Sequence, residues 1–190
     1  MRIIAGIFRG RTLKTVEGPG YRPAMSRVRE SLFSMLEARG VVWGDCRVMD
    51  LFAGSGSLAF EALSRGAQAA TLVEMAPQAV KCLRANAAML GLDEGSCRIV
   101  ADDVLKMLGR GYPQACDVVF IDPPYRKNLL QPALRSLLRR NWLPEGALVC
   151  AEIEVALAFD AEQAHPELEV LADRTFGQTR IIIWKRTNIQ

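Results

Sequence analysis

The sequence predicts a doubly wound α/β fold. From Arg47 onward, segments with strand character alternate with helical segments, at the spacing of right-handed β-α-β crossovers. Three strands, 48–51, 118–121 and 181–184, are nearly continuous apolar runs, which is typical of strands with helices on both faces. A glycine-rich loop follows the first of them and opens a helix, an arrangement found in sheets that bind nucleotides.

The elements follow from local signals along the chain. Residues 2–15 contain two short β-like runs and predict a hairpin. Ser26 is a good N-cap for a helix that Gly40 ends. Strands are then predicted at 47–52, 70–74, 98–101, 117–121 and 147–153, with helices at 57–65, 77–90, 104–108 and 129–140. The last apolar runs, 168–172 and 180–185, lack a helix-length connector and predict an antiparallel hairpin. We divide the chain into a basic β-hairpin extension, 1–24, and one α/β domain, 25–190.

The composition is that of a globular protein and excludes several classes of site. Of the 190 residues 50% are apolar and 24% charged. No uncharged apolar run approaches the ~18 residues of a membrane span, and the run between Arg2 and Arg9 is too short for a signal-peptide core, so we expect a cytoplasmic protein with no membrane partner. The five cysteines lack CxxC spacing, which favours reduced thiols. With His165 as the single histidine, we expect no metal and no histidine-dependent nucleophile.

Positive charge is concentrated at the N-terminus. Residues 1–29 hold seven basic residues and one acidic residue, whereas the remainder holds 17 basic and 20 acidic residues. Six of the seven are arginines, whose planar fork suits bidentate phosphate contact. A nucleic-acid partner is therefore favoured, although a merely solubilising N-terminus stays open. The residues expected to contact RNA are Arg2, Arg9, Arg11, Arg22 and Arg27.

The glycine-rich loop predicts a cofactor site. The string DLFAGSGSLA, residues 50–59, fits GxGxxG/A, and its glycines permit a ligand to approach the backbone of Ala53, Gly54, Ser55 and Gly56. Glu74 ends the next strand, where it can accept hydrogen bonds from ribose hydroxyls. A loop that only packs a helix on a strand is the alternative.

Acidic residues around this loop indicate which cofactor binds. The Asp50 carboxylate would be unfavourable next to a dinucleotide pyrophosphate, but it suits a cationic group such as the ammonium of a methionine moiety. This favours S-adenosylmethionine over NAD. After the third strand, Asp102 or Asp103 could accept from an adenine amino group. We favour Asp103, because the turn into the helix begins there, and Asp102 remains an alternative. Either residue could instead be a helix N-cap.

The string Asp122-Pro123-Pro124-Tyr125 follows the fourth strand, at the edge where open α/β sheets bind ligands. The two prolines hold the Asp122 carboxylate and the Pro123 carbonyl in one geometry. Both groups are acceptors, so together they can hold the two N–H bonds of an exocyclic amino group and localise the nitrogen lone pair. Tyr125 offers a ring on which a nucleobase can stack. A rigid surface turn is the alternative.

These motifs resemble class I S-adenosylmethionine-dependent N-methyltransferases. The start MRIIAGIFRGRTL, the segment Arg22-Pro23 with RVRESLF at 27–33, and LFAGSGSLAFEALSRGA at 51–67 are similar to one branch, the RsmD family. Residues 176–179 (FGQT) also fit, with Phe where Tyr is common. The resemblance implies a Rossmann-like, seven-stranded, mostly parallel sheet with an N-terminal β-hairpin. It also implies methylation of guanine 966 of 16S ribosomal RNA on N2, in the 30S subunit or its assembly intermediate. We expect a monomer.

Three other functions would account for part of the sequence. Adenine-N6 methylation of nucleic acid uses the same tetrapeptide logic, but sequence-specific DNA modification usually needs extra residues that read base edges. A non-catalytic RNA-binding assembly module would use the basic residues without methyl transfer. An NAD-dependent oxidoreductase would leave the tetrapeptide without a role. The first two remain open.

Overall fold

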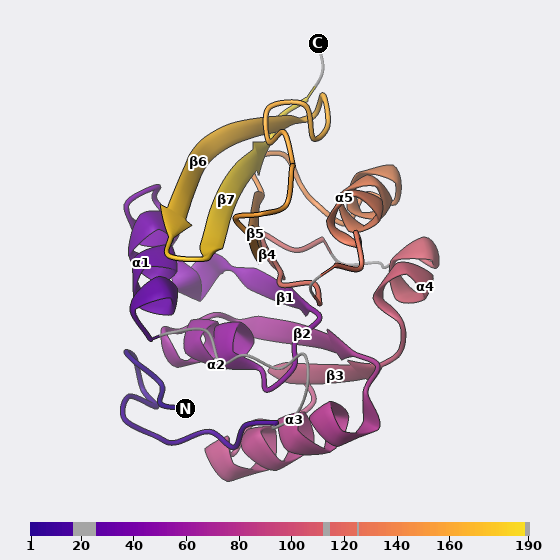
Figure 1. Ribbon diagram of the computed structural model, residues 1–190. Coiled ribbons are helices and arrows are strands. Elements are labelled where there is room, and N and C mark those ends of the chain that lie inside the picture. The colour runs from indigo at the N-terminus through magenta and orange to yellow at the C-terminus, as the bar shows by residue number, and fades with distance from the viewer. Residues whose placement is uncertain (17–25, 112–114, 125, 189–190) are drawn as a thin grey trace.

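A seven-stranded sheet runs through the molecule (Figure 1). The computed structural model describes residues 1–16, 26–111, 115–124 and 126–188. The strand order is β3-β2-β1-β4-β5-β7-β6; β1 to β5 run parallel, and β7 is antiparallel to both β5 and β6. This confirms the predicted fold class and the closing hairpin. The strands are β1 (Arg47–Leu51), β2 (Ala69–Glu74), β3 (Cys97–Ala101), β4 (Val118–Ile121), β5 (Leu148–Glu154), β6 (Leu168–Phe176) and β7 (Thr179–Arg186).

The sheet has a topological switch point between β1 and β4. From β1 the chain proceeds through β2 and β3 to one edge, then returns to place β4 on the other side of β1. The crossover connections leave β1 and β4 in opposite directions, so a crevice opens at their carboxyl ends. The glycine-rich loop follows β1 and Asp122 follows β4, so the order of strands brings both predicted motifs to this crevice.

Helices cover both faces of the sheet (Figure 1). Alternate side chains of each strand point to opposite faces, and the core divides accordingly into two clusters. One cluster contains Val48, Phe120 and Cys150 together with residues of α1 (Ser26–Glu37), α2 (Ser57–Ser64) and α3 (Pro77–Leu90). The other holds residues of α4 (Val104–Gly109) and α5 (Leu130–Arg139). A single 3-10 turn, η1 (Trp43–Asp45), precedes β1.

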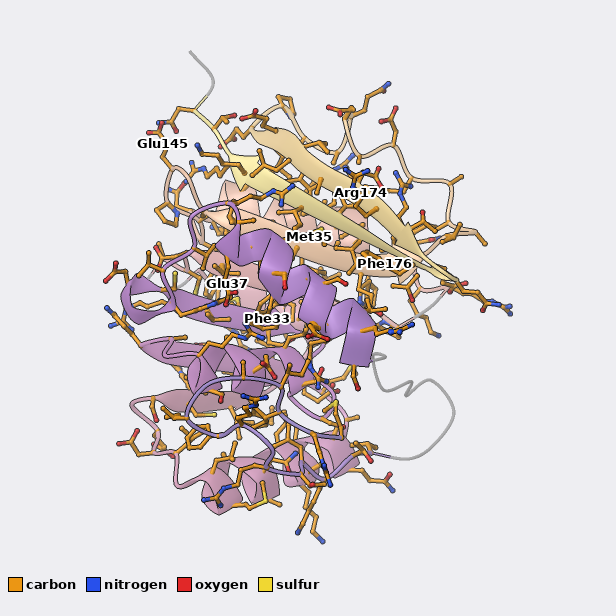
Figure 2. The ribbon with its side chains drawn as sticks, turned by 90° about the vertical axis from the view of Figure 1, so that its left-hand side faces the viewer. Phe33, Met35, Glu37, Glu145, Arg174 and Phe176 are labelled. Carbon is orange, nitrogen blue, oxygen red and sulfur yellow. The ribbon has the colours of Figure 1, made fainter. Side chains whose placement is uncertain are left out.

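Helix α1 lies across the first of these faces (Figure 2). Its Phe33 ring is 5.7 Å from the Phe120 ring of β4 and 5.1 Å from the Trp43 ring, measured between centroids. The Arg65 guanidinium lies 4.7 Å from the Phe33 centroid and also pairs with Glu37 at 2.7 Å. Helix α1 is therefore part of the domain core.

The N-terminal arm, residues 1–16, is docked on α2. The predicted hairpin is reduced to a single antiparallel bridge, between Arg2 and Thr12. The amides of Ile4 and Ala5 donate to the fully buried Glu61 carboxylate at 2.8 and 3.0 Å, so these two donors bind α2 and do not extend the ladder. The predicted domain boundary after residue 24 lies outside the described residues.

The arm meets the end of α2 at Gly6. The Ile7 amide donates to the Ser64 carbonyl at 2.7 Å, which caps the helix C-terminus. A Cβ on Gly6, whose φ is +81°, would lie 1.7 Å from that carbonyl oxygen. Only glycine permits this close approach, so the sequence of the arm is matched to the helix beneath it.

The remaining element predictions agree with the structure to within a few residues. The largest difference is the first strand of the closing hairpin, which extends to Phe176 because β7 pairs with it along its whole length. Across the described ranges, no helix combines the length and apolarity needed to cross a membrane.

Candidate active site

The glycine turn after β1 adopts the conformation that its composition predicted. Gly54 and Gly56 have φ values of +53° and +79°, and Phe52 just before them has φ +65°, which is rare outside glycine. A Cβ on Gly56 would lie 2.4 Å from the Phe60 ring, so this position also needs glycine for packing. The turn leads into α2, and its residues Gly54 and Ser55 are partly exposed at the carboxyl end of β1.

Glu74, at the end of β2, is held against this turn. One carboxylate oxygen accepts from the Gly54 amide at 2.9 Å, and the other accepts from the amides of Met75 and Ala76 at 2.9 and 2.8 Å. Glu74 is 8% exposed, so these three N–H groups fix its orientation at the mouth of the turn. The carboxylate oxygens retain lone pairs that can accept from a ligand.

Asp50 lies beneath the turn and is only 2% exposed. Its Oδ2 accepts from the Ala59 amide at 3.2 Å, which ties the first turn of α2 to β1. Burial raises the pKa of Asp50 to about 7, against the lowering effect of the Ala59 hydrogen bond; the negative charge of Glu74 adds to the rise. This carboxyl therefore changes its charge near neutral pH.

Asp122 and Pro123 continue β4 into the crevice. The Asp122 amide donates to the Leu51 carbonyl at 3.4 Å, which holds the start of the tetrapeptide against the end of β1. Burial raises the pKa of Asp122 well above that of an ordinary carboxyl, and the charges of Glu152 and Asp50 raise it further. The structure therefore brings the predicted catalytic acid close to the predicted cofactor loop. Tyr125 lies outside the described residues.

Glu152 is an acidic residue of this site that the sequence analysis missed. It lies in β5, is 9% exposed, and has its pKa raised by burial. A charged residue inside the otherwise apolar run 147–153 was a signal in the sequence. Only the pairing of β4 with β5 places it beside Asp122.

The two aspartates after β3 have different surroundings. Asp103 is the N-cap of α4, because its Oδ1 accepts from the Lys106 amide at 2.9 Å. Asp102 accepts from the Asp103 amide at 2.9 Å and pairs with Arg110 at 2.9 Å. The N-cap alternative is therefore realised at Asp103, whose second oxygen takes no part in the cap bond.

Asn86 of α3, also missed by the sequence analysis, joins the arm to the glycine turn. It is fully buried; its Oδ1 accepts from the Lys14 amide at 2.8 Å, and its Nδ2 donates to the carbonyls of Lys14 and Ser55 at 3.0 and 3.1 Å. The Ser55 hydroxyl accepts from the Val16 amide at 3.1 Å. The end of the arm thus lies on the predicted cofactor loop.

The predicted RNA-contacting arginines are exposed where the structure describes them. Arg2, Arg9 and Arg11 project from the docked arm, and Arg27 lies in the first turn of α1. Arg22 lies outside the described residues. Arg29, by contrast, is 2% exposed, and its Nε lies 3.9 Å from a Glu61 carboxylate oxygen. Its charge is therefore paired inside the protein, where the arm packs on α2, and is not presented at the surface.

A hollow of about 420 Å³ adjoins the tetrapeptide. Pro123 and Pro124 line it, together with Ile153 and the loop that carries Arg126 and Asn128. These last two residues have φ values of +62° and +51°, and left-handed backbone at non-glycine residues concentrates at functional sites. Within the described ranges, no group of three or more metal-ligating side chains could hold a metal ion.

Comparison with known proteins places the chain in a family. The model of the family described as conserved hypothetical protein 95 matches residues 1–185. Ribosomal RNA small subunit methyltransferase D of Escherichia coli K12 is 37% identical over 187 residues, covering 98% of this chain and 90% of the relative. Its namesake in Haemophilus influenzae is 39% identical over 155 residues, covering 81% and 79%.

Solved structures agree with this placement. A candidate methyltransferase from Escherichia coli superposes with a TM-score of 0.82 at 36% identity, covering 98% of this chain and 97% of that one. A protein from Thermus thermophilus superposes with a TM-score of 0.79 at 30% identity, covering 97% and 99%. The resemblance read from the motifs is confirmed over nearly the whole length: this chain belongs to the RsmD family, whose model carries the description conserved hypothetical protein 95.

Proposed function

We propose that this protein transfers a methyl group from S-adenosylmethionine to the N2 amino group of a guanine in small-subunit ribosomal RNA, at position 966 of 16S RNA. The observation that carries the proposal is the meeting of two motifs at one switch point: the glycine turn after β1 and Asp122-Pro123 after β4. The relatives named as small-subunit ribosomal RNA methyltransferases support the reaction class and the kind of RNA. The expected substrate is the 30S subunit or its assembly intermediate.

The acceptor groups at the turn suit S-adenosylmethionine. This cofactor carries an ammonium, a sulfonium and a ribose diol, and the carboxyls of Asp50 and Glu74 flank the turn that would receive them. We assign Glu74 to the ribose hydroxyls and Asp50 to the ammonium end. The backbone of Ala53, Gly54, Ser55 and Gly56 would border the methionine moiety. Asp102, or the free oxygen of Asp103, would accept from the adenine amino group.

The catalytic role of Asp122 follows from its place and its chemistry. When bound, S-adenosylmethionine supplies a methyl group activated by the positive charge on sulfur. The Asp122 carboxylate and the Pro123 carbonyl each accept one N–H bond of the guanine amino group, which orients the nitrogen lone pair toward the turn. Alignment of this kind accounts for a large part of the rate in such transfers. The raised pKa of Asp122 also suits it to take the proton that the methylated nitrogen sheds.

The arm supplies the RNA contacts in this proposal. Arg2, Arg9, Arg11 and Arg27 contact phosphates, and Arg22 is assigned the same role from the sequence alone. Because backbone amides of the arm donate to the Glu61 carboxylate and to the Ser64 carbonyl, the arginines of the arm are carried on a docked segment. Phosphate contacts of this kind should make RNA binding fall steeply as the salt concentration rises.

The direct test is transfer of tritium from labelled S-adenosylmethionine to 30S subunits that lack the modification. Free 16S RNA and DNA serve as controls. We expect label in 30S subunits, in N2-methylguanosine after digestion, at position 966. Label in N6-methyladenosine would establish the adenine alternative, and RNA binding without any transfer would establish the non-catalytic one.

A variant separates chemistry from folding. Asp122→Ala should keep binding of S-adenosylhomocysteine within about threefold, measured by calorimetry, and lose turnover by on the order of a hundredfold or more. Asp93→Ala makes the same chemical change in the exposed turn before β3, at the end of the parallel strands opposite to the crevice, and should leave both unchanged. Loss of cofactor binding in Asp122→Ala would contradict the role given to Asp122.

A further inference from the structure

Glu152 faces the same crevice as Asp122. Ile121 of β4 pairs with Ala151 of β5, so the next residues, Asp122 and Glu152, stand side by side on neighbouring parallel strands. Residues two apart on a strand share a face, so Glu152 points to the same side of the sheet as Cys150, and Asp122 to the same side as Phe120. Cys150 and Phe120 both belong to the α1–α3 face, which is also the face of Val48 and hence of Asp50.

The Glu152 carboxyl has no hydrogen-bond or ion-pair partner among the residues that the structure describes. No hydrogen bond or ion pair within the described ranges reaches it, although the side chain is nine-tenths buried. The other two buried glutamates differ: Glu61 accepts two backbone amides and faces two arginines, and Glu74 accepts three backbone amides. The Glu152 oxygens are not among the fully buried, unpartnered side-chain atoms of the described residues, so this carboxyl reaches the crevice and is open to a ligand. Its position beside Asp122 points to a donor that arrives with the substrate.

We propose that Glu152 accepts the N1–H of the target guanine and so selects guanine over other purines; this rests on the proposed function. The edge of guanine next to its amino group carries three N–H bonds, two on N2 and one on N1. The Asp122 carboxylate and the Pro123 carbonyl take the two on N2. Glu152, level with Asp122 and on the same face, is the third acceptor that this edge requires.

The same arrangement disfavours purines without an N1 proton. In adenine and in 2,6-diaminopurine, N1 is a lone-pair acceptor, which would face a carboxylate across a dry contact. Sites built to hydrogen-bond a substrate N–H discriminate strongly against analogues that lack it, because the buried group is left unpaired. Glu152 is therefore a specificity-determining residue, distinct from the acid that holds the reacting nitrogen.

The test compares two substrates that both carry the 2-amino group. Small-subunit particles are reconstituted with RNA holding either guanine or 2,6-diaminopurine at the methylated position, and kcat/KM is measured for each. The wild type should favour guanine by on the order of ten- to a hundredfold. Glu152→Gln, whose amide can either accept or donate, should bring the ratio to within about threefold of unity. Glu169→Gln, the same change at an exposed position of β6, should leave the ratio unchanged.

Three outcomes of this comparison would contradict the role proposed for Glu152. A wild-type enzyme that methylates both bases equally would overturn the inference without any variant, and it would leave the proposed methyl transfer standing. Equal losses on both substrates in Glu152→Gln, with S-adenosylhomocysteine binding intact, would mean that Glu152 acts on folding or proton transfer and would also overturn it. Absence of methylation of guanine by the wild type would refute the proposed function, and this inference with it.

Discussion

Replacing Asp50 by Asn should stabilise the protein and weaken its cofactor binding. Asn has the shape of the neutral acid, and its Oδ1 can still accept from the Ala59 amide. The Asp50 pKa rises from 3.8 in a free chain to about 7 in the fold, so folding favours the protonated form. Above pH 4 the unfolded chain ionises this group while the folded chain keeps it neutral, and the free energy of unfolding falls until the pH reaches about 7.

The size of the effect follows from that shift. The rise of the Asp50 pKa from 3.8 to about 7 lowers the free energy of unfolding by about 4 kcal/mol above pH 7, and by about half of that near pH 5.5. Asp50→Asn should therefore gain about 2 kcal/mol more over the wild type at pH 8 than at pH 5.5, measured by urea unfolding followed by circular dichroism. Asp93→Asn, at a fully exposed site, is the control and should show no such gain.

Binding completes the test of Asp50. If its carboxylate meets the ammonium end of the cofactor, Asp50→Asn should bind S-adenosylhomocysteine on the order of ten- to a hundredfold more weakly by calorimetry at pH 8. A stability gain that is the same at both pH values, or no gain at all, would refute the reasoning about the buried charge. Unchanged affinity would refute only the ammonium assignment.

Three further changes test how the arm is held. Gly6→Ala places a Cβ against the Ser64 carbonyl and should make the arm susceptible to cleavage by trypsin. Gly10 has a similar φ of +82° with open space around it, so Gly10→Ala is the control and should lower the free energy of unfolding in urea by only about 1 kcal/mol. Equal cleavage of the two variants would contradict the role of the close approach. Glu61→Gln leaves the buried Arg29 guanidinium without its counterion and should lower the free energy of unfolding by about 3 kcal/mol. A loss of less than about 1 kcal/mol would contradict this role of Glu61. Asn86→Ala should both expose the arm to trypsin and weaken S-adenosylhomocysteine binding, since this side chain joins the two; an effect on only one of them would show that they are independent.

Local patterns were sufficient to predict the regular part of the fold. The continuous apolar runs and the helical segments between them identified the parallel strands, because a strand that is buried on both faces consists almost entirely of apolar residues. The glycine turn was equally predictable, since Gly54 and Gly56 adopt positive φ values that other residues rarely take. Asp122 and Glu74 were predicted as site residues from their places on predicted strands: Glu74 ends one strand, and Asp122 directly follows another.

The sequence by itself determined the class of sheet, the glycine turn and the two strand-end acids, because each depends on neighbours within a few residues along the chain. Only the tertiary structure decided that Glu152 stands beside Asp122, that Asn86 ties Lys14 to Ser55, and that the arm docks on Glu61. These contacts join residues far apart in the chain, and they arise from strand order and helix packing. Packing decides whether a carboxyl such as Glu61 or Glu152 has a partner among the described residues, and the residues next to it in the sequence do not show which case applies.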